Sequence, residues 1–223
     1  MIRIRKVLSI TELDELARLL KTGKFTDGRV SAGGAGQSIK SNLQLDPKDP
    51  NGPKANQLVH NALLRCEDFK ACAYPHRVSG ITFSRYMEGM KYGEHTDNPV
   101  NWDHGQVLRS DMSFTIFLSS PDEYEGGELV LRILGQEFAV KYELGDMAIY
   151  PSGLVHRVNE VTSGCRRAAI GWLQSLVPQQ ERREVLGAIW RVRNELLASA
   201  GRSDAFLQLD FAHSNLQRMW TEN

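Results

Sequence analysis

The sequence predicts a β-rich fold with helices on both sides, and two observations lead to this class. Between about Val78 and Gln174, seven short runs of β-branched and aromatic residues alternate with turn residues. Before and after this region, apolar residues recur at helical intervals instead. Seven such runs are typical of an all-β sandwich, a barrel or a jelly roll. The runs are residues 80–86, 111–118, 128–134, 136–142, 146–150, 154–161 and 166–173.

The segment before the β region, residues 1–77, reads as an α/β flank. Alternating apolar residues from Ile2 predict a short strand, and the leucines that follow Thr11 predict a capped amphipathic helix. Residues 31–54 are rich in Gly, Ser, Asp, Asn and Pro, so we expect a long flexible loop with at most one short strand. A second helix is expected over residues 55–68.

The clearest strand pattern lies in residues 111–118. Met112, Phe114, Ile116 and Leu118 fall on one face, whereas Ser113 and Thr115 fall on the other. The glycines of residues 123–129 (EYEGGEL) and 134–136 (LGQ) allow the tight reversals that such strands need.

The segment after Pro178 returns to a helical pattern. Leu186, Ile189, either Val192 or Arg193, and Leu196 are spaced along one helix face. Gly201 interrupts this helix, and Ser203-Asp204 predicts the cap of a final one. This helical tail, residues 178–223, is expected either to pack on the β domain as a buttress or to form a dimer interface.

Composition limits the class of protein. The 223 residues carry 27 Lys+Arg and 27 Asp+Glu, so no basic surplus points to a nucleic-acid partner. The first residues lack the apolar run of a signal peptide or membrane span. Cys66, Cys72 and Cys165 are odd in number and show no CxxC spacing. We therefore expect a cytoplasmic protein without a membrane segment.

His95 and Asp97 lie in the stretch YGEHTDNP and are candidate metal ligands. Their spacing alone is weak, because so short a pattern also arises by chance. If residues 94–98 are extended, however, both side chains project from the same face. An imidazole and a carboxylate then converge on one point, which suits a divalent metal.

His156 is the best candidate for a third ligand. It shares a strand face with Val158, while Arg157 and Asn159 take the opposite face. Alone it could equally be a satisfied core histidine. With His95 and Asp97 it completes the two-histidine, one-carboxylate set of non-haem Fe(II) oxygenases. The remaining histidines read as solvated or core residues, and His104 is the least firmly set aside; they are His60, His76, His104 and His213.

Arg166 lies ten residues after His156 and shares a strand face with Ala168, Ile170 and Trp172. If that face points inward, the guanidinium is buried and needs an anion. A ligand carboxylate gripped by two parallel hydrogen bonds is one candidate. A cross-strand salt bridge to Glu160 is the other. A hairpin would place Arg166 beside the His156 strand.

The order His95, Asp97, His156 and Arg166 resembles the Fe(II)/2-oxoglutarate-dependent dioxygenases. The stretch RYMEGMKYGEHTDNP, residues 85–99, is similar to the motif of their prolyl-4-hydroxylase branch. With EGGEL, GDMAIYPSGLVHRV and the helical tail, nearly the whole chain resembles the bacterial PKHD-type hydroxylases (the PiuC/YbiX group).

This resemblance implies a double-stranded β-helix (jelly roll) over residues 78–177, with iron held by His95, Asp97 and His156. It implies that Arg166 binds the distal carboxylate of 2-oxoglutarate and that Tyr86 donates a hydrogen bond to the same cosubstrate. Tyr92 competes with Tyr86 for that role, and either ring could only pack. The resemblance also implies L-ascorbate as the reductant that restores Fe(II), with no catalytic residue beyond the metal ligands.

The expected activity is hydroxylation of a substrate coupled to oxidative decarboxylation of 2-oxoglutarate. A peptide and a small molecule are both open as substrates, and so is a link to iron uptake. One alternative is a cupin-like metal-binding module without oxygenase activity. Another is an interaction protein that self-associates through its C-terminal helices.

Overall fold

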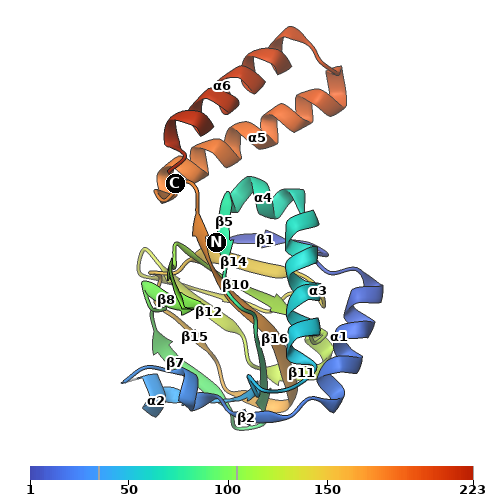
Figure 1. Cartoon of the computed structure of the whole chain (residues 1–223), viewed down its shortest axis with the longest axis vertical. Helices are drawn as coiled ribbons and strands as arrows, with labels where there is room; N and C mark the ends of the chain where they lie inside the picture. Colours follow the sequence, from blue (N-terminus) through green and yellow to red (C-terminus); the bar gives the residue numbers. More distant parts are fainter. Residues whose placement is uncertain (35, 104, 223) are drawn as a thin grey trace.

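The computed structural model describes residues 1–34, 36–103 and 105–222, and two antiparallel sheets form its centre (Figure 1). The larger sheet has nine strands and runs in the order β1-β14-β10-β16-β6-β4-β2, with β5 and β11 also paired to β16. Its strands are β1 (Ile2–Ile4), β2 (Phe25–Asp27), β4 (Leu43–Leu45), β5 (Pro75–Val78), β6 (Thr82–Met87), β10 (Met112–Phe117), β11 (Tyr124–Gly126), β14 (Met147–Pro151) and β16 (Val161–Ser175).

The smaller sheet has five strands in the order β13-β12-β15-β7-β3. They are β3 (Lys40–Ser41), β7 (Lys91–His95), β12 (Leu129–Ile133), β13 (Gln136–Val140) and β15 (His156–Val158). A separate hairpin pairs β8 (Val100–Asp103) with β9 (Gln106–Arg109). Leu134 and Gly135 both have positive φ in the β12–β13 turn, so the tight reversal predicted at LGQ is confirmed.

Helices cover the outer face of the larger sheet (Figure 1). Leu16, Val59 and Phe69 from three helices pack with Phe114 of β10 and Ile149 of β14 in one apolar core. Both faces of this sheet are therefore covered in its central strands, as the fully buried β10 shows. The helical elements are α1 (Ile10–Thr22), η1 (Gly28–Ser31), α2 (Gly36–Ile39), α3 (Gly52–Arg65), α4 (Glu67–Ala73), η2 (Pro121–Glu123), α5 (Gln180–Ala200) and α6 (Asp204–Trp220).

The space between the sheets has an apolar part and an open part. Phe117, Leu131 and Tyr150 belong to a buried cluster that joins strands of both sheets. Elsewhere the facing strands enclose a cavity lined by residues of both. Two facing antiparallel sheets with an N-terminal α/β flank and a C-terminal helical tail confirm the predicted jelly-roll architecture.

Three predictions for the N-terminal flank were wrong in detail. Ser9, and not Thr11, caps α1: its hydroxyl accepts from the Glu12 amide at 3.4 Å, and the Glu12 carboxylate accepts from the Ser9 amide at 2.8 Å. Residues 31–54 hold α2 and two strands, and α3 begins within them at Gly52. The expected helix over 55–68 is two helices that meet at Cys66.

The C-terminal helices form a hairpin that extends away from the sheets (Figure 1). The α5 helix ends at Gly201, and the Ser203 hydroxyl caps α6 as predicted. Arg193 donates a hydrogen bond to Asp210 of α6 at 2.6 Å, whereas Val192 is 48% exposed. Of the two residues, Arg193 therefore lies on the face of α5 that packs against α6. The base of the hairpin packs on the rest of the chain, through Tyr74, Val177, Leu186, Leu216 and Trp220. The expected packing of the tail is therefore found at its base, and the dimer interface stays a prediction.

Among the described residues, none of the helices combines the length and the apolar character required to cross a lipid bilayer.

Candidate active site

A cavity of about 660 Å³ lies between the two sheets. The smaller sheet contributes β7 and β15 to its wall, and the larger sheet contributes β6, β10 and β16. Residues from the segment 31–44 close one side, because β3 pairs with β7 while β4 pairs with β6. Its volume falls in the range of about 300–1,000 Å³ that is usual for small-molecule sites.

His95, Asp97 and His156 lie together in this cavity. His95 is the last residue of β7, and its register partner on β15 is His156, so the two rings are 4.2 Å apart between centroids. The strand ends at His95, and residues 96–98 lie outside any strand. The Asp97 amide donates to the carbonyl of Ser152 at 3.3 Å, and this bond ties the segment after β7 to the loop after β14.

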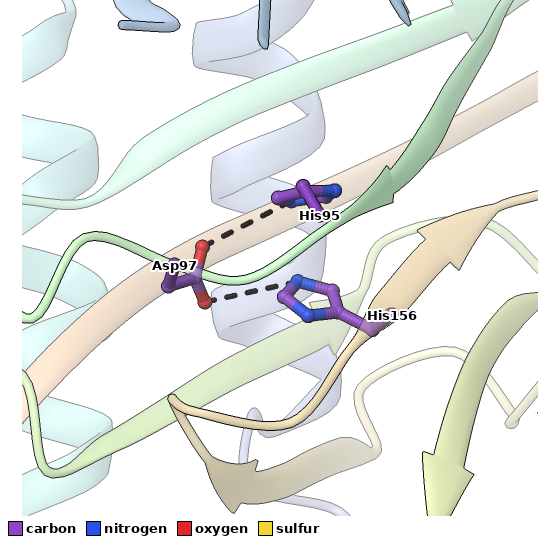
Figure 2. A group of neighbouring side chains, drawn as sticks. All are labelled: His95, Asp97 and His156. Carbon is purple, nitrogen blue, oxygen red and sulfur yellow. Dashed lines mark ion pairs between the residues drawn. The ribbon is translucent and has the colours of Figure 1, made fainter. Parts of the chain in front are cut away.

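The three side chains point toward one another (Figure 2). The Nε2 atom of His95 is 4.0 Å from Asp97 Oδ1, and that of His156 is 3.7 Å from Asp97 Oδ2. Both separations exceed hydrogen-bond length, so the imidazoles do not satisfy the carboxylate. One ligand atom from each residue lies within 4.8 Å of the others. Two imidazoles and a carboxylate in this arrangement suit a divalent first-row metal that keeps open positions.

Backbone carbonyls fix the tautomer of both histidines. The Nδ1 atom of His95 donates to the Gly93 carbonyl at 2.8 Å, and that of His156 donates to the Leu154 carbonyl at 2.9 Å. A carbonyl oxygen only accepts, so the proton of each neutral ring lies on Nδ1 and the Nε2 lone pair faces the centre. Burial, with the neighbouring His156 as second cause, lowers the pKa of His95 to about 4.

Ser113 orients Asp97 and was missed in the sequence. Its hydroxyl donates to Asp97 Oδ2 at 2.5 Å and is 2.7 Å from the Ser152 hydroxyl. Ser113 is on β10, so this bond crosses from the larger sheet to the end of β7. The sequence shows Ser113 on the polar face of a strand whose other face is wholly apolar. It does not show that Asp97 is its hydrogen-bond partner.

Arg166 lies on β16 in the larger sheet, and His156 lies on β15 in the smaller one. The expected hairpin between their strands was therefore wrong, because the chain crosses from one sheet to the other between them. Arg166 and the two histidines line the same cavity from facing sheets. The alternative partner for Arg166, a salt bridge to Glu160, is not formed, since Glu160 is exposed and pairs with Lys91 at 2.8 Å.

The Arg166 guanidinium is buried without a protein anion. The residue is 1% exposed, and its Nε and Nη1 atoms have no hydrogen-bond partner among the described residues. Its nearest ring contacts are Tyr86 at 5.2 Å and Phe117 at 5.7 Å from the guanidinium carbon to the centroids. A buried cation with free donors costs stability unless an anion binds it, so the site fits a ligand carboxylate.

Tyr86 and Tyr92 occupy different parts of the cavity wall. Tyr86 on β6 is the register partner of Arg166 and is 1% exposed. Burial raises the pKa of its phenol, while Arg166 and Asn42 oppose that shift. Tyr92 on β7 stacks on His95 with 3.7 Å between ring centroids. Tyr86 thus neighbours Arg166, and Tyr92 neighbours His95.

The other histidines lie away from this group. His60 bonds through Nδ1 to the Asn56 carbonyl at 2.9 Å within α3, and His213 on α6 bonds to the Tyr74 hydroxyl at 2.9 Å. His76 is exposed on β5. His104 lies outside the described residues.

Known proteins similar to this chain agree with the geometry. The 2OG-Fe(II) oxygenase superfamily matches over residues 81–174, which contain all five candidate site residues. A PKHD-type hydroxylase of Crocosphaera subtropica is 40% identical over 219 residues, 98% of this chain and 98% of its own length. Sequence identity of this extent over nearly the full length of both proteins shows that they belong to one family.

Solved structures show the same fold at low identity. A prolyl hydroxylase from Trichoplax adhaerens, solved with a hypoxia inducible factor peptide fragment, has a TM-score of 0.56 and 18% identity over 83% of this chain and 86% of its own. HygX from Streptomyces hygroscopicus, solved with nickel, 2-oxoglutarate and hygromycin B, has a TM-score of 0.52 and 13% identity over 76% and 80%. With the full-length relative, the conclusion is that this chain belongs to the PKHD-type hydroxylases of the 2OG-Fe(II) oxygenase superfamily and is a 2-oxoglutarate-dependent dioxygenase.

Proposed function

We propose that His95, Asp97 and His156 hold Fe(II), and that Arg166 binds the distal carboxylate of 2-oxoglutarate, in an enzyme that hydroxylates its substrate. One observation carries this proposal. Three ligand-type atoms within 4.8 Å of one another share a cavity with a buried, unpaired guanidinium. The first group suits a divalent metal and the second suits a carboxylate, and the cosubstrate of this superfamily needs both.

Bound iron and 2-oxoglutarate supply the oxidising chemistry, in which decarboxylation of 2-oxoglutarate to succinate activates dioxygen. The residues of the chain supply binding and orientation. The Gly93 and Leu154 carbonyls keep both Nε2 lone pairs available, and Ser113 holds the Asp97 carboxylate in place. No side chain besides the metal ligands is required to act as a catalytic residue.

Tyr86 is proposed as the second contact to 2-oxoglutarate. It faces Arg166 across the β6–β16 ladder and borders the cavity. Its phenol keeps its proton because burial raises the pKa, so it is a hydrogen-bond donor to a carboxylate. Tyr92 is assigned to packing, since its ring is stacked on His95.

The substrate is proposed to be a peptide or a small molecule, because the cavity has room for a small-molecule ligand. We include L-ascorbate as the reductant that restores Fe(II), and a role in iron uptake, as further parts of this proposal. Cytoplasmic location is supported by the three cysteines, which are free thiols in the fold. Mass spectrometry of cell extract treated with the enzyme, searched for a gain of one oxygen atom, would identify the substrate.

The domain limits follow the same proposal. Residues 1–77 form the flank, residues 78–177 the oxygenase domain and residues 178–223 the helical extension. The extension is proposed to mediate self-association, since Phe211 and Met219 of α6 are more than two-thirds exposed, at 72% and 71%. Truncation after Pro178 should leave iron chemistry intact and abolish any oligomer seen by light scattering.

Anaerobic addition of Fe(II) and 2-oxoglutarate tests the proposal directly. The wild-type protein should develop a visible metal-to-ligand charge-transfer band and, in air, convert 2-oxoglutarate to succinate. Asp97→Ala should lose Fe(II) affinity by about 100-fold or more, because the only carboxylate of the group is removed. Asp122→Ala removes an exposed carboxylate and serves as the matched control.

A cupin-like metal module gives the opposite results. It would bind metal without the charge-transfer band, and its metal affinity would not respond to 2-oxoglutarate. Wild-type Fe(II) affinity in Asp97→Ala would contradict the proposed ligand set.

A further inference from the structure

Lys40 is a second buried cation in the active-site cavity, and the proposed chemistry does not use it. It lies on β3 as the register partner of Tyr92 and is 7% exposed. The segment that carries it is firmly seated, because Ile39 packs directly on Gly93, where a side-chain Cβ would come within 2.9 Å of Ile39. Lys40 therefore occupies a defined position in the cavity wall.

No carboxylate neutralises Lys40 among the described residues. Its Nζ donates to the Ser31 hydroxyl at 2.8 Å, and that hydroxyl donates in turn to the Gly28 carbonyl at 3.0 Å. The ammonium also lies 5.0 Å from the Tyr92 ring centroid. An ammonium has three donors, so two of them remain for a ligand.

The acidic residues of the cavity wall are already engaged. The wall contains two carboxylates, Glu94 and Asp97. Glu94 pairs with Arg132 at 2.5 Å and with Arg157 at 3.3 Å. Asp97 belongs to the metal group. Nearby Asp27 is held by Arg29 at 2.5 Å.

With Fe(II) and 2-oxoglutarate bound, the positive charge of Lys40 would have no negative charge to balance it. The charges of Fe(II) and 2-oxoglutarate cancel, and those of Asp97 and Arg166 cancel as well. One positive charge therefore remains on Lys40, which is buried, and an unpaired buried charge is costly. A single negative charge on the substrate would neutralise it.

We propose that Lys40 is a specificity-determining residue that binds a carboxylate of the substrate. This inference rests on the proposed function and names its substrate class: a peptide or small molecule with a carboxylate near the carbon that is hydroxylated. The Tyr92 ring contacts both Lys40 and His95, so it links the anion subsite to the metal group. A carboxylate fits better than a phosphate, because one surplus charge matches a monoanion.

The consequence for the lysine itself is a lowered proton affinity. Burial lowers the pKa of Lys40 to about 8, so the ammonium form still predominates at neutral pH. Bound carboxylate would favour that form further.

Calorimetry with a matched pair of probes tests the proposal. The holoenzyme, carrying Ni(II) in place of iron and saturating 2-oxoglutarate, cannot turn over and has Arg166 occupied. Benzoate should bind to it, and benzamide, which has the same shape without the charge, should bind at least about tenfold more weakly. Lys40→Met should reduce benzoate affinity by at least about tenfold and leave benzamide unchanged. Lys40→Arg should restore part of the benzoate affinity.

Two measurements separate this proposal from the one it rests on. The matched control is Lys91→Met, which removes an exposed lysine on β7 beside Tyr92 and should behave as wild type. If Ni(II) and 2-oxoglutarate do not bind the wild-type protein, the proposed function fails. If they bind but benzoate does not, or binds Lys40→Met equally, the carboxylate subsite is refuted. A weaker 2-oxoglutarate affinity in both Lys40 variants would assign Lys40 to the cosubstrate and overturn the proposal.

Discussion

The two sheets that face each other across the cavity differ in what covers them. The nine-stranded sheet is buried on its outer face by α1, α3 and α4, whereas the five-stranded sheet carries exposed ion pairs there, such as Arg157 with Glu137 at 2.6 Å. The first sheet supplies Arg166 and Tyr86, and the second supplies His95 and His156. Lys40 is on β3, the two-residue strand at the edge of the second.

Under the proposed function, this difference would separate binding of the cosubstrate from access of the substrate. A guanidinium that is 1% exposed needs a dry, rigid wall, and a sheet buried on both faces provides one. The metal proposed at His95, Asp97 and His156 would need open positions for its other ligands, and the cavity between the sheets provides the space beside these residues. The edge is also where short strands can vary without disturbing the core.

The largest expected effect is on folding and compares one phenylalanine from each sheet. Phe114→Ala should lower the free energy of unfolding by about 3–5 kcal/mol, because its fully buried ring packs against Gly171 and Phe69. Phe138→Ala on β13 should cost less than about 1 kcal/mol, since that residue is 42% exposed. Urea titration of both variants measures the pair, and equal losses would show that the two sheets are not differently supported.

Apolar and polar alternation in the sequence predicts only part of the difference in burial between the two sheets. Alternation identified the faces of β15, where His156 and Val158 are buried and Arg157 is not. In β10 every residue is buried. Alternation there separates the helix-facing Phe114 from the cavity-facing Ser113, but it does not separate buried residues from exposed ones. Which strand pairs with which is a long-range property, and this is why Arg166 was expected beside His156 and not opposite it.

The next largest effect is on the cosubstrate. Arg166→Ala should weaken 2-oxoglutarate binding by about 100-fold, because a buried charge-assisted pair is lost. Fe(II) affinity should not change, since none of the three proposed metal ligands lies on β16 with Arg166. Anaerobic titration that follows the charge-transfer band measures both. Loss of Fe(II) and 2-oxoglutarate together would mean that the two sheets do not divide these roles.

Ser113 tests a side-chain hydrogen bond that joins the larger sheet to Asp97. Ser113→Ala removes the donor at 2.5 Å from Asp97 Oδ2, so Fe(II) affinity should fall by about tenfold with a smaller change in 2-oxoglutarate affinity. Ser113→Thr keeps the hydroxyl and should recover most of the loss. A metal affinity that is unchanged in Ser113→Ala would show that Asp97 is oriented by the backbone alone.

Lys40 and Ser113 were both missed, for related physical reasons. Lys40 sits in a Gly-, Ser- and Pro-rich stretch whose composition indicates a loop, and its strand exists only through pairing with β7 some fifty residues away. The convergence of His95, Asp97 and His156 was easier to predict, because the first two are close in sequence and His156 lies on a strongly alternating strand. Site residues can be predicted from the sequence when local spacing brings them together. They cannot be predicted when only long-range strand pairing does so.

The smallest expected effect is a pH dependence that separates the edge strand from the central sheet. Above a pKa of about 8 Lys40 loses its charge, so benzoate affinity for the Ni(II) holoenzyme should fall by about tenfold from pH 7 to pH 9. Of the groups facing Lys40, Asp97 and Asp27 favour its charged form. Tyr92 has a pKa of about 12 and His95 a pKa of about 4, so neither ring titrates between pH 7 and pH 9. Binding of 2-oxoglutarate through Arg166 should stay constant, since a guanidinium keeps its charge. Lys40→Arg should make benzoate binding independent of pH, and a decline that persists in this variant would place the titrating group elsewhere in the cavity.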